Sequence, residues 1–196
     1  MTIPIILASA SPRREALLRQ IGVCFEVVAS DISEDFEAAL SPREVVRLLS
    51  KRKCLAVAAK RPEALVIAAD TVVSLDGQIL GKPASAGMAT KMLAQLNNRT
   101  HQVITGVVMH CADKGILEAF EVASDVTFGN LYHELIEEYI KTGEPLDKAG
   151  AYAIQGIGAL LVQSIRGSYS NIVGLPLFEV AELVRKYVGK DAFFRS

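Results

Sequence analysis

The stretch IILASASPRREALLRQIG, residues 5–22, contains the transition that decides the fold class. It opens on a short apolar run, and such a run before a Ser-Pro pair predicts a buried strand over residues 3–8. A Ser followed by a Pro is typical of a helix start, with Ser11 as the N-cap and Pro12 in the first helical position. The sequence therefore predicts a strand that leads directly into a helix over residues 12–21.

The first turn of this helix contains two arginines at the end where the helix dipole is already positive. Arg13 and Arg14 each oppose that dipole by roughly a few tenths of a kcal/mol. The next Ser-Pro-Arg sequence, which begins at Ser41, instead has a glutamate where a carboxylate completes a capping box. Free N–H groups at a helix N-terminus and planar guanidinium groups both suit phosphate oxygens. With the hydroxyls of Ser9 and Ser11, the arginines predict a phosphate-binding segment. The alternative is a solvated helix start whose arginines point away.

Strand and helix signals continue along the chain and predict an α/β fold. Strands are expected at residues 24–29, 64–69 with a continuation over 72–75, 78–80, 101–112 and 116–129, and within AYAIQG and GALLVQSIRG; helices are expected at residues 42–60, 85–96, 131–141 and 176–188. Strands and helices alternate at first and hairpin signals dominate the middle, which indicates a mixed sheet. Because no repeat, linker or low-complexity tract divides these elements, we expect residues 1–196 to form a single domain.

The composition argues against several classes of function. The 196 residues carry a net charge of −1 and a pI of about 6.3, so no overall basic field attracts nucleic acid or a membrane surface. No apolar run reaches the roughly 18 residues of a membrane-spanning helix, and the N-terminus lacks the basic segment of a signal peptide. The three cysteines form no CxxC pair, which is typical of inert thiols in a reducing compartment. We expect a cytoplasmic protein without nucleic-acid or membrane partners.

Several catalytic signatures are missing from the sequence. It contains no P-loop, no complete dinucleotide-binding glycine motif and no G-x-S-x-G nucleophile elbow. The three histidines do not have the spacing of metal ligands. An enzyme built from this sequence would therefore work with carboxylates, cations and a metal.

Two acids and two lysines are the candidates for that chemistry. Asp70 closes the predicted strand over residues 64–69, where a carboxylate is a common metal ligand or general base in α/β proteins, although it can also simply cap a turn. Glu34, in the acidic loop after the second strand, is a second hard oxygen ligand or a solvated side chain. Lys53 and Lys82 can neutralise phosphate charge, and each can equally be an ordinary surface lysine.

Taken together, these segments resemble the Maf family of nucleotide pyrophosphatases. The matching stretches are LASASPRREALL (7–18), VIAADTVV (66–73), LGKP (80–83), TGVVM (105–109), GEPLDKAGAYAIQG (143–156) and VGLPL (173–177). The resemblance implies a hydrolase that cleaves a nucleoside 5′-triphosphate between its α- and β-phosphates and releases pyrophosphate. It also implies a divalent cation, Mg²⁺ or Mn²⁺, a homodimer, and a mixed twisted sheet with flanking helices in two lobes around a central cleft, similar to inosine triphosphatase.

The resemblance also implies roles for individual residues. Asp70 matches the proton acceptor and, together with Glu34, the acids near the metal. The positions that match substrate-binding residues are Ser9, Ser11, Arg13, Arg14, Lys53 and Lys82. The positions that match specificity residues, Arg13, Thr71 and Gln155, are those of the branch that acts on dTTP, UTP and modified uridine nucleotides, rather than of the branch that prefers 7-methyl-GTP. A neutral amide such as that of Gln155 can pair with the donor and the acceptor of a pyrimidine imide.

Two other functions fit the same residues. A non-catalytic nucleotide-binding regulator of cell division, in line with the family's link to septum formation, would use the arginines and the acidic loop for binding alone. An enzyme of broader specificity would also accept CTP or modified bases. Pyrophosphate release from a panel of nucleotides distinguishes these alternatives.

Overall fold

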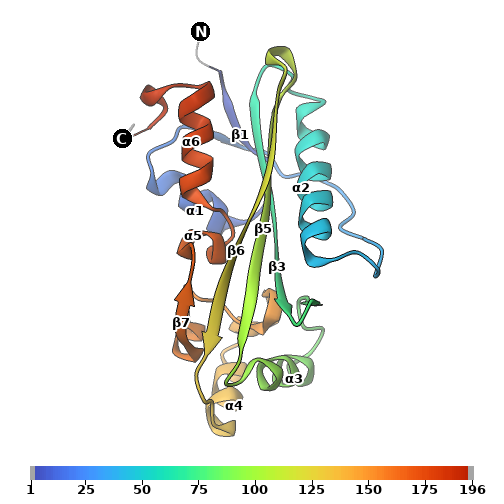
Figure 1. The fold of residues 1–196 in the computed structure, drawn as a ribbon, viewed down its shortest axis with the longest axis vertical. Helices are drawn as coiled ribbons and strands as arrows, with labels where there is room; N and C mark the ends of the chain where they lie inside the picture. The colour runs from blue at the N-terminus through green and yellow to red at the C-terminus, as the bar shows by residue number, and fades with distance from the viewer. Residues whose placement is uncertain (1–2, 194–196) are drawn as a thin grey trace. The chain divides into compact units, whose positions relative to one another are not determined.

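The strand predicted at the start of the chain is part of a mixed sheet in the computed structural model, which describes residues 3–193. The strands are β1 (Ile5–Leu7), β2 (Glu26–Val27), β3 (Leu65–Leu75), β4 (Gln78–Leu80), β5 (Thr100–Cys111), β6 (Ile116–Phe128) and β7 (Val162–Arg166). Their order in the seven-stranded sheet is β2-β1-β3-β5-β6-β7, with β4 paired to β3. β1 runs parallel to β2 and β3, whereas the β3–β4 and β6–β7 pairs are antiparallel. The predicted mixed α/β sheet is confirmed (Figure 1).

The helices are α1 (Pro12–Gln20), α2 (Pro42–Ala58), α3 (Ala86–Leu96), α4 (His133–Lys141), α5 (Tyr169–Val173) and α6 (Leu177–Tyr187). The first two begin where the Ser-Pro pairs predict them. Ser41 caps α2, and the Glu44 side chain completes the predicted capping box by accepting from the Ser41 backbone N–H at 2.8 Å. Gly22, which follows α1, has a φ of 69°, a conformation that suits glycine at a helix C-terminus.

The chain divides into two compact units. The first unit comprises the described residues of Met1–Thr71, Thr105–Val122 and Gly174–Ser196. The second unit comprises Val72–Ile104 and Ala123–Val173. The long strands β3, β5 and β6 each contribute residues to both units.

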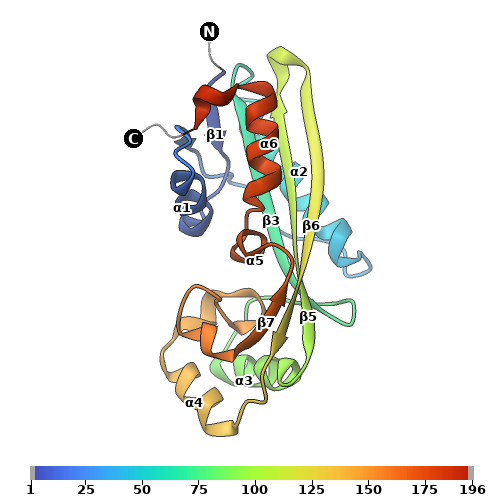
Figure 2. The same ribbon diagram turned by 60° about the vertical axis from the view of Figure 1, so that its left-hand side comes forward.

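In the first unit, α2 covers one face of the sheet and α1 and α6 lie on the other face (Figures 1 and 2). The face toward α2 has a buried apolar core of Ile6, Ala8, Cys54, Val57, Ala58, Ala64, Val66, Ala68 and Val108. The helix and the sheet come very close at Gly106: a Cβ on this residue would lie 2.6 Å from the Val46 carbonyl oxygen, so a larger residue does not fit. The glycine of the TGVVM motif therefore has a packing role.

The second unit packs α3 and α4 against its part of the sheet (Figure 2). Three rings meet edge to face in its core, with centroids 4.8–5.4 Å apart: His101, Phe128 and Tyr152. His101 Nε2 and the Tyr152 hydroxyl are 2.8 Å apart, and His101 Nδ1 has no hydrogen-bond partner among the described residues. Burial lowers the pKa of His101 to about 4, so the ring is neutral in the folded protein near pH 7.

We expect this histidine to make the fold sensitive to mild acid. In the unfolded chain the His101 pKa returns to about 6.5, so below that pH the unfolded state binds a proton that the folded state does not. The free energy of unfolding should therefore fall as the pH drops from 6.5 toward 4, by up to about 3 kcal/mol for a shift of about 2.5 units. Urea unfolding at pH 7, 6 and 5 measures this loss. The free energy of unfolding should depend less on pH in His101→Gln than in the wild type. The control His133→Gln should keep the wild-type dependence, because the His133 side chain is 70% exposed. An equal pH dependence in both variants would contradict the assignment to His101.

Two details of the predicted fold are wrong. The AYAIQG segment is not a strand, because the chain turns at its start: Gly150, directly before the segment, and Ala151, its first residue, have positive φ angles of 69° and 59°. The short helix α5 was not predicted, because its five residues lack a helical pattern of their own.

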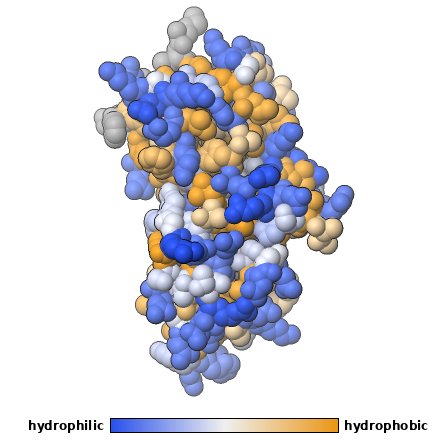
Figure 3. Space-filling model, viewed as in Figure 1, coloured by the Kyte–Doolittle hydropathy of each residue, from blue (hydrophilic) through white to orange (hydrophobic). Residues whose placement is uncertain are grey.

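Polar and apolar residues are intermixed on the face shown in Figure 3. No helix within residues 3–193 is long and apolar enough to cross a membrane.

Candidate active site

The candidate site is built around Asp70 and Thr71 of β3. The prediction that Asp70 closes its strand is wrong: the strand continues to Leu75, because β5 runs alongside it as its neighbour in the sheet. On the other edge of β3, β1 pairs with Leu65–Ile67 and β4 pairs with Val73–Leu75. Asp70 and Thr71 lie in the interval between these two pairings.

Lys53 connects the two acids predicted to act together. Its Nζ lies 2.6 Å from Asp70 Oδ1 and 2.5 Å from Glu34 Oε1. The side chains of Lys53 and Asp70 are 9% and 10% exposed, whereas that of Glu34 is 61% exposed. Lys53 is thus a buried counter-ion on α2 and not the solvated lysine of the alternative interpretation. The position is readable in the sequence, since residue 53 lies one helical turn from each of the apolar residues Leu49 and Val57.

The surroundings of Asp70 act on its pKa in opposite directions. Burial raises the pKa, and the charge and hydrogen bond of Lys53 and the charge of Arg14 oppose that increase, with a net raised value. Desolvation of a carboxylate favours its protonated form, so an ionised Asp70 has a higher proton affinity than a solvated aspartate. This is the property that a proton acceptor requires.

Arg14 links the start of α1 to Thr71. Its guanidinium donates to the Gly174 carbonyl oxygen at 2.8 Å, to Thr71 Oγ1 at 2.9 Å and to Ser9 Oγ at 3.4 Å. Burial lowers the pKa of Arg14 below its usual value, and the charge of Asp70 offsets only part of that decrease. Gly174 has a φ of 128°, a backbone conformation that L side chains rarely adopt. The glycine of the VGLPL motif thereby turns its carbonyl toward the arginine.

The two arginines of α1 have different surroundings. Arg13 is half-buried, and its guanidinium has no hydrogen-bond or ion-pair partner within residues 3–193. The Ser11 hydroxyl makes no capping hydrogen bond, while the Ser11 N–H donates to Ser9 Oγ at 3.1 Å. Arg13 and the first turn of α1 therefore retain donors for an anion, whereas Arg14 already holds protein acceptors.

Thr105 was not identified from the sequence. Its hydroxyl lies 2.9 Å from Thr71 Oγ1, so Thr71 is held between Arg14 and Thr105. The signal available in the sequence is its place directly before Gly106 in the TGVVM motif. The structure therefore uses the Thr71 hydroxyl, predicted to read the base, to orient Arg14.

The remaining predicted residues, Lys82 and Gln155, belong to the second unit. Both are exposed. The Gly81 carbonyl before Lys82 accepts from the Gly150 N–H at 3.1 Å, so this turn is tied to the residue directly before the AYAIQG segment. Within the first unit, the structure brings together the six predicted residues Ser9, Arg14, Glu34, Lys53, Asp70 and Thr71.

The donor set around Lys53 decides what kind of metal would fit. Within residues 3–193 no group of three or more His, Cys, Asp or Glu side chains is arranged to hold a metal ion. The carboxylates of Asp70 and Glu34 both contact the ammonium of Lys53. Mg²⁺ is typically bound by one or two carboxylates together with substrate phosphates and water. The pair fits a cation that arrives with a polyphosphate, and it does not form a complete metal cage.

Comparison with known proteins gives these residues a family context. A family model described as Maf-like protein matches residues 4–187. A curated dTTP/UTP pyrophosphatase of Clostridioides difficile (strain 630) is 46% identical over 192 residues, which cover 97% of this chain and 98% of that protein. Curated dTTP/UTP pyrophosphatases of Moorella thermoacetica and Desulforamulus reducens are 49% and 44% identical, and the matches cover 97% and 94% of this chain and 98% and 96% of those proteins.

Proposed function

The chain belongs to the Maf family, and from this premise we propose that it is a nucleoside 5′-triphosphate pyrophosphatase that hydrolyses dTTP and UTP. The products are the nucleoside monophosphate and pyrophosphate. The observation that carries the proposal is the ion-paired set of Asp70, Lys53 and Glu34 beside the Arg14–Thr71 contact, in a chain that is similar over nearly its whole length to proteins named dTTP/UTP pyrophosphatase.

In the proposed reaction, a water oxygen attacks the α-phosphorus and the bond from that phosphorus to the bridging oxygen of the β-phosphate breaks. Pyrophosphate leaves with the electron pair of that bond. Asp70 accepts a proton from the water, and Lys53 keeps the carboxylate ionised and in place. Arg13 and the N–H groups at the start of α1 bind phosphate oxygens and stabilise the negative charge that develops on the leaving group.

A divalent cation, Mg²⁺ or Mn²⁺, would be held by Asp70 and Glu34 together with the phosphates, and it would neutralise phosphate charge and favour ionisation of water. Lys53, which pairs with both acids, would stay with them and add positive charge for the phosphates of the substrate. Lys82, an exposed cation of the second unit, is also proposed to bind the phosphates. Catalysis in this scheme depends on positioning and on electrostatic stabilisation.

Gln155 is proposed to distinguish the bases. The Watson–Crick edge of thymine and uracil offers an N–H donor next to a carbonyl acceptor, and a primary amide matches both groups. The exposed side chain of Gln155 is available for this contact. Thr71 contributes indirectly in this proposal, through the orientation of Arg14.

A nucleotide panel tests the proposed function. The purified protein is incubated with dTTP, UTP, CTP, dATP, dGTP and 7-methyl-GTP in the presence of Mg²⁺ or Mn²⁺, and the products are separated by chromatography. Release of pyrophosphate and monophosphate, fastest with dTTP and UTP, supports the proposal. Binding without any turnover would instead indicate the non-catalytic regulator, and equal turnover of CTP would indicate the enzyme of broader specificity.

We also propose that the enzyme acts as a homodimer in the cytoplasm, as expected from the resemblance to the family and from the absence of a signal-peptide pattern in the sequence. Light scattering of the purified protein at several concentrations measures the mass. A mass of one chain, about 21 kDa, at all of them would contradict the dimer.

Arg13→Ala should mainly weaken binding of the triphosphate. Arg13 has no protein partner within the described residues, so its removal leaves no unpaired acceptor in the fold, and the thermal stability should not change. We expect the KM for dTTP to increase by at least about tenfold, since a hydrogen bond between charged groups contributes about 1.5–3 kcal/mol. The control is Arg19→Ala, which removes an exposed arginine of the same helix that pairs with Glu15. Unchanged kinetics in Arg13→Ala would exclude Arg13 from the phosphate site.

A further inference from the structure

The loop that carries Gln155 is fastened at both ends to one pair of side chains in the second unit. The Glu144 carboxylate accepts hydrogen bonds from the Ile157 N–H at 3.0 Å and from the Gly158 N–H at 2.9 Å. It also accepts from the Tyr139 hydroxyl at 2.8 Å. The same hydroxyl accepts from the Ala153 N–H at 3.2 Å. Gln155 therefore lies on a short loop whose first and last residues are bound by the Glu144–Tyr139 pair.

This pair is a rigid support for the loop. Tyr139 lies on α4, is 2% exposed and belongs to the hydrophobic core of the second unit. Although burial raises the pKa of Glu144, the hydrogen bonds from Gly158, Tyr139 and Ile157 have the larger combined effect and lower it. Glu144 is thus ionised near pH 7, and each of its three bonds is a charge-assisted hydrogen bond.

The glycines of the loop give independent evidence that close contact with this pair is built into the sequence. A Cβ on Gly156 would lie 2.1 Å from Glu144 Oε2. A Cβ on Gly158 would lie 2.6 Å from the Tyr139 hydroxyl oxygen. Gly156 has a φ of −126°, which any residue adopts. The need for glycine at position 156 therefore comes from the carboxylate and not from the backbone conformation.

A fixed loop matters for the chemistry that Gln155 is proposed to perform. Rotation of a primary amide by half a turn exchanges its donor and its acceptor. A glutamine whose position against the base is not fixed can therefore pair with cytosine as well as with uracil or thymine. The loop backbone does not set the rotation of the amide itself, but it sets the distance and the direction from which the amide meets the base. A loop bound at both ends keeps that distance and direction constant, which a specific pairing requires.

We propose that Glu144, together with Tyr139, is a positioning residue that holds the loop 153–158 so that Gln155 selects thymine and uracil over cytosine. This inference rests on the proposed function, because it assigns a cause to the base preference of that activity. It extends the specificity determinants to two side chains that are not proposed to touch the nucleotide.

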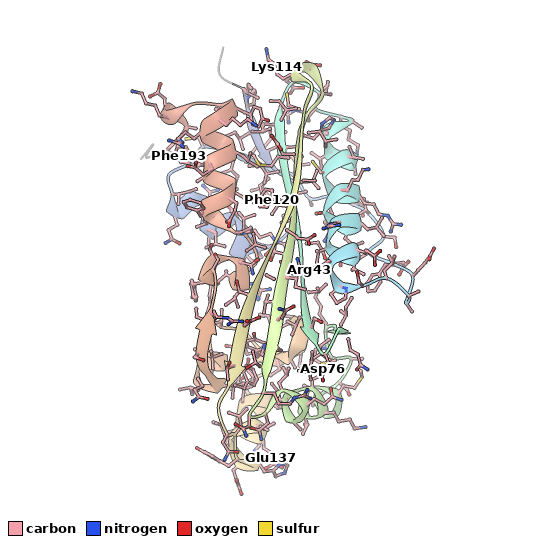
Figure 4. The ribbon with its side chains drawn as sticks, in the orientation of Figure 1. Arg43, Asp76, Lys114, Phe120, Glu137 and Phe193 are labelled. Carbon is pink, nitrogen blue, oxygen red and sulfur yellow. The ribbon has the colours of Figure 1, made fainter. Side chains whose placement is uncertain are left out.

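The test measures base discrimination, defined as kcat/KM for dTTP divided by kcat/KM for CTP. Glu144→Ala should lower this ratio at least about tenfold, mainly through the KM for dTTP. Gly156→Ala should lower it in the same direction, because the added methyl group displaces the carboxylate. Matched controls are Glu137→Ala, an exposed glutamate of α4 (Figure 4), and Gly87→Ala, where the nearest atom to the added Cβ is 4.0 Å away; neither should change the ratio.

A double-mutant cycle separates positioning from a general structural role. In a Gln155→Ala background, Glu144→Ala should cause no further loss of discrimination, since the loop then has no amide to present. Should Glu144→Ala fail to fold, Tyr139→Phe keeps the buried ring and removes only the hydroxyl, and it should reduce the ratio by a smaller factor. Hydrogen exchange of the Ile157 and Gly158 amides in the free protein should be faster in the variants than in the wild type.

The outcomes distinguish this inference from the proposed function. If the wild type does not hydrolyse dTTP or UTP, the proposed function fails and this inference fails with it. If the wild type hydrolyses dTTP but Glu144→Ala and Gly156→Ala retain its discrimination, the inference alone is overturned. The same conclusion follows if the losses in Glu144→Ala and Gln155→Ala are additive.

Discussion

Replacing Asp70 by asparagine should lower kcat for dTTP by at least about 10²-fold, the lower range for the loss of a general base. Asparagine has the same shape and retains an oxygen that can accept from Lys53 Nζ, which now lies 2.6 Å from Asp70 Oδ1. The fold should therefore persist while the proton acceptor and the ionised oxygen ligand are lost. Steady-state pyrophosphate release measures kcat, and circular dichroism with thermal unfolding checks the fold.

The control for this variant is Asp76→Asn. Asp76 lies in the turn between β3 and β4 (Figure 4), its side chain is 71% exposed, and it pairs with Arg99. Its φ of 52° is one that asparagine also tolerates. The same chemical change six residues along the chain should leave kcat unchanged. Turnover of Asp70→Asn equal to that of this control would remove Asp70 from the mechanism.

The local signals in the sequence predicted the local structure well. The Ser-Pro starts at Ser11 and Ser41 begin helices, and Gly22 ends the first of them. These features depend on neighbouring residues alone. Ser41 forms its capping box with Glu44, three positions on, and Pro12 opens the first helix although the Ser11 hydroxyl makes no capping hydrogen bond. Of the two short strands predicted within AYAIQG and GALLVQSIRG, only the second is present, as β7. The chain turns at Gly150 and Ala151, where φ is positive, and Gly150 is held there by its bond to Gly81, a contact distant in sequence.

The site was predicted as a set of residue types but not as a network. Asp70, Lys53 and Glu34 were each selected, yet only the fold shows that one ammonium binds both acids. The Glu144–Gly158 contact spans 14 positions and involves a backbone N–H, which no residue pattern displays. Arg13 and Arg14 look alike in sequence, and they differ because Gly174, 160 positions from Arg14, supplies a carbonyl to Arg14.

The second large effect is expected from Lys53→Met. Methionine fills a similar volume without a charge, and the carboxylate of Asp70 then stays buried without its counter-ion. We expect the free energy of unfolding to fall by about 3 kcal/mol, the lower end of the range for breaking a buried ion pair. The value of kcat should fall about 10²- to 10³-fold, as for the loss of one electrostatic group in a site. The control is Lys51→Met, an exposed position on the same helix, which should affect neither quantity.

The combination of Lys53→Met with Asp70→Asn separates the ion pair from other effects of the lysine. If the instability of Lys53→Met comes from an uncompensated carboxylate, removing that charge should restore part of the stability. The free energy of unfolding of the double variant should then be at least about 1 kcal/mol higher than that of Lys53→Met. Activity should not return, because the proton acceptor is absent. A double variant that is less stable than both single variants would show that Lys53 packs in α2 for reasons unrelated to Asp70. The ion pair would then no longer support the proposed site.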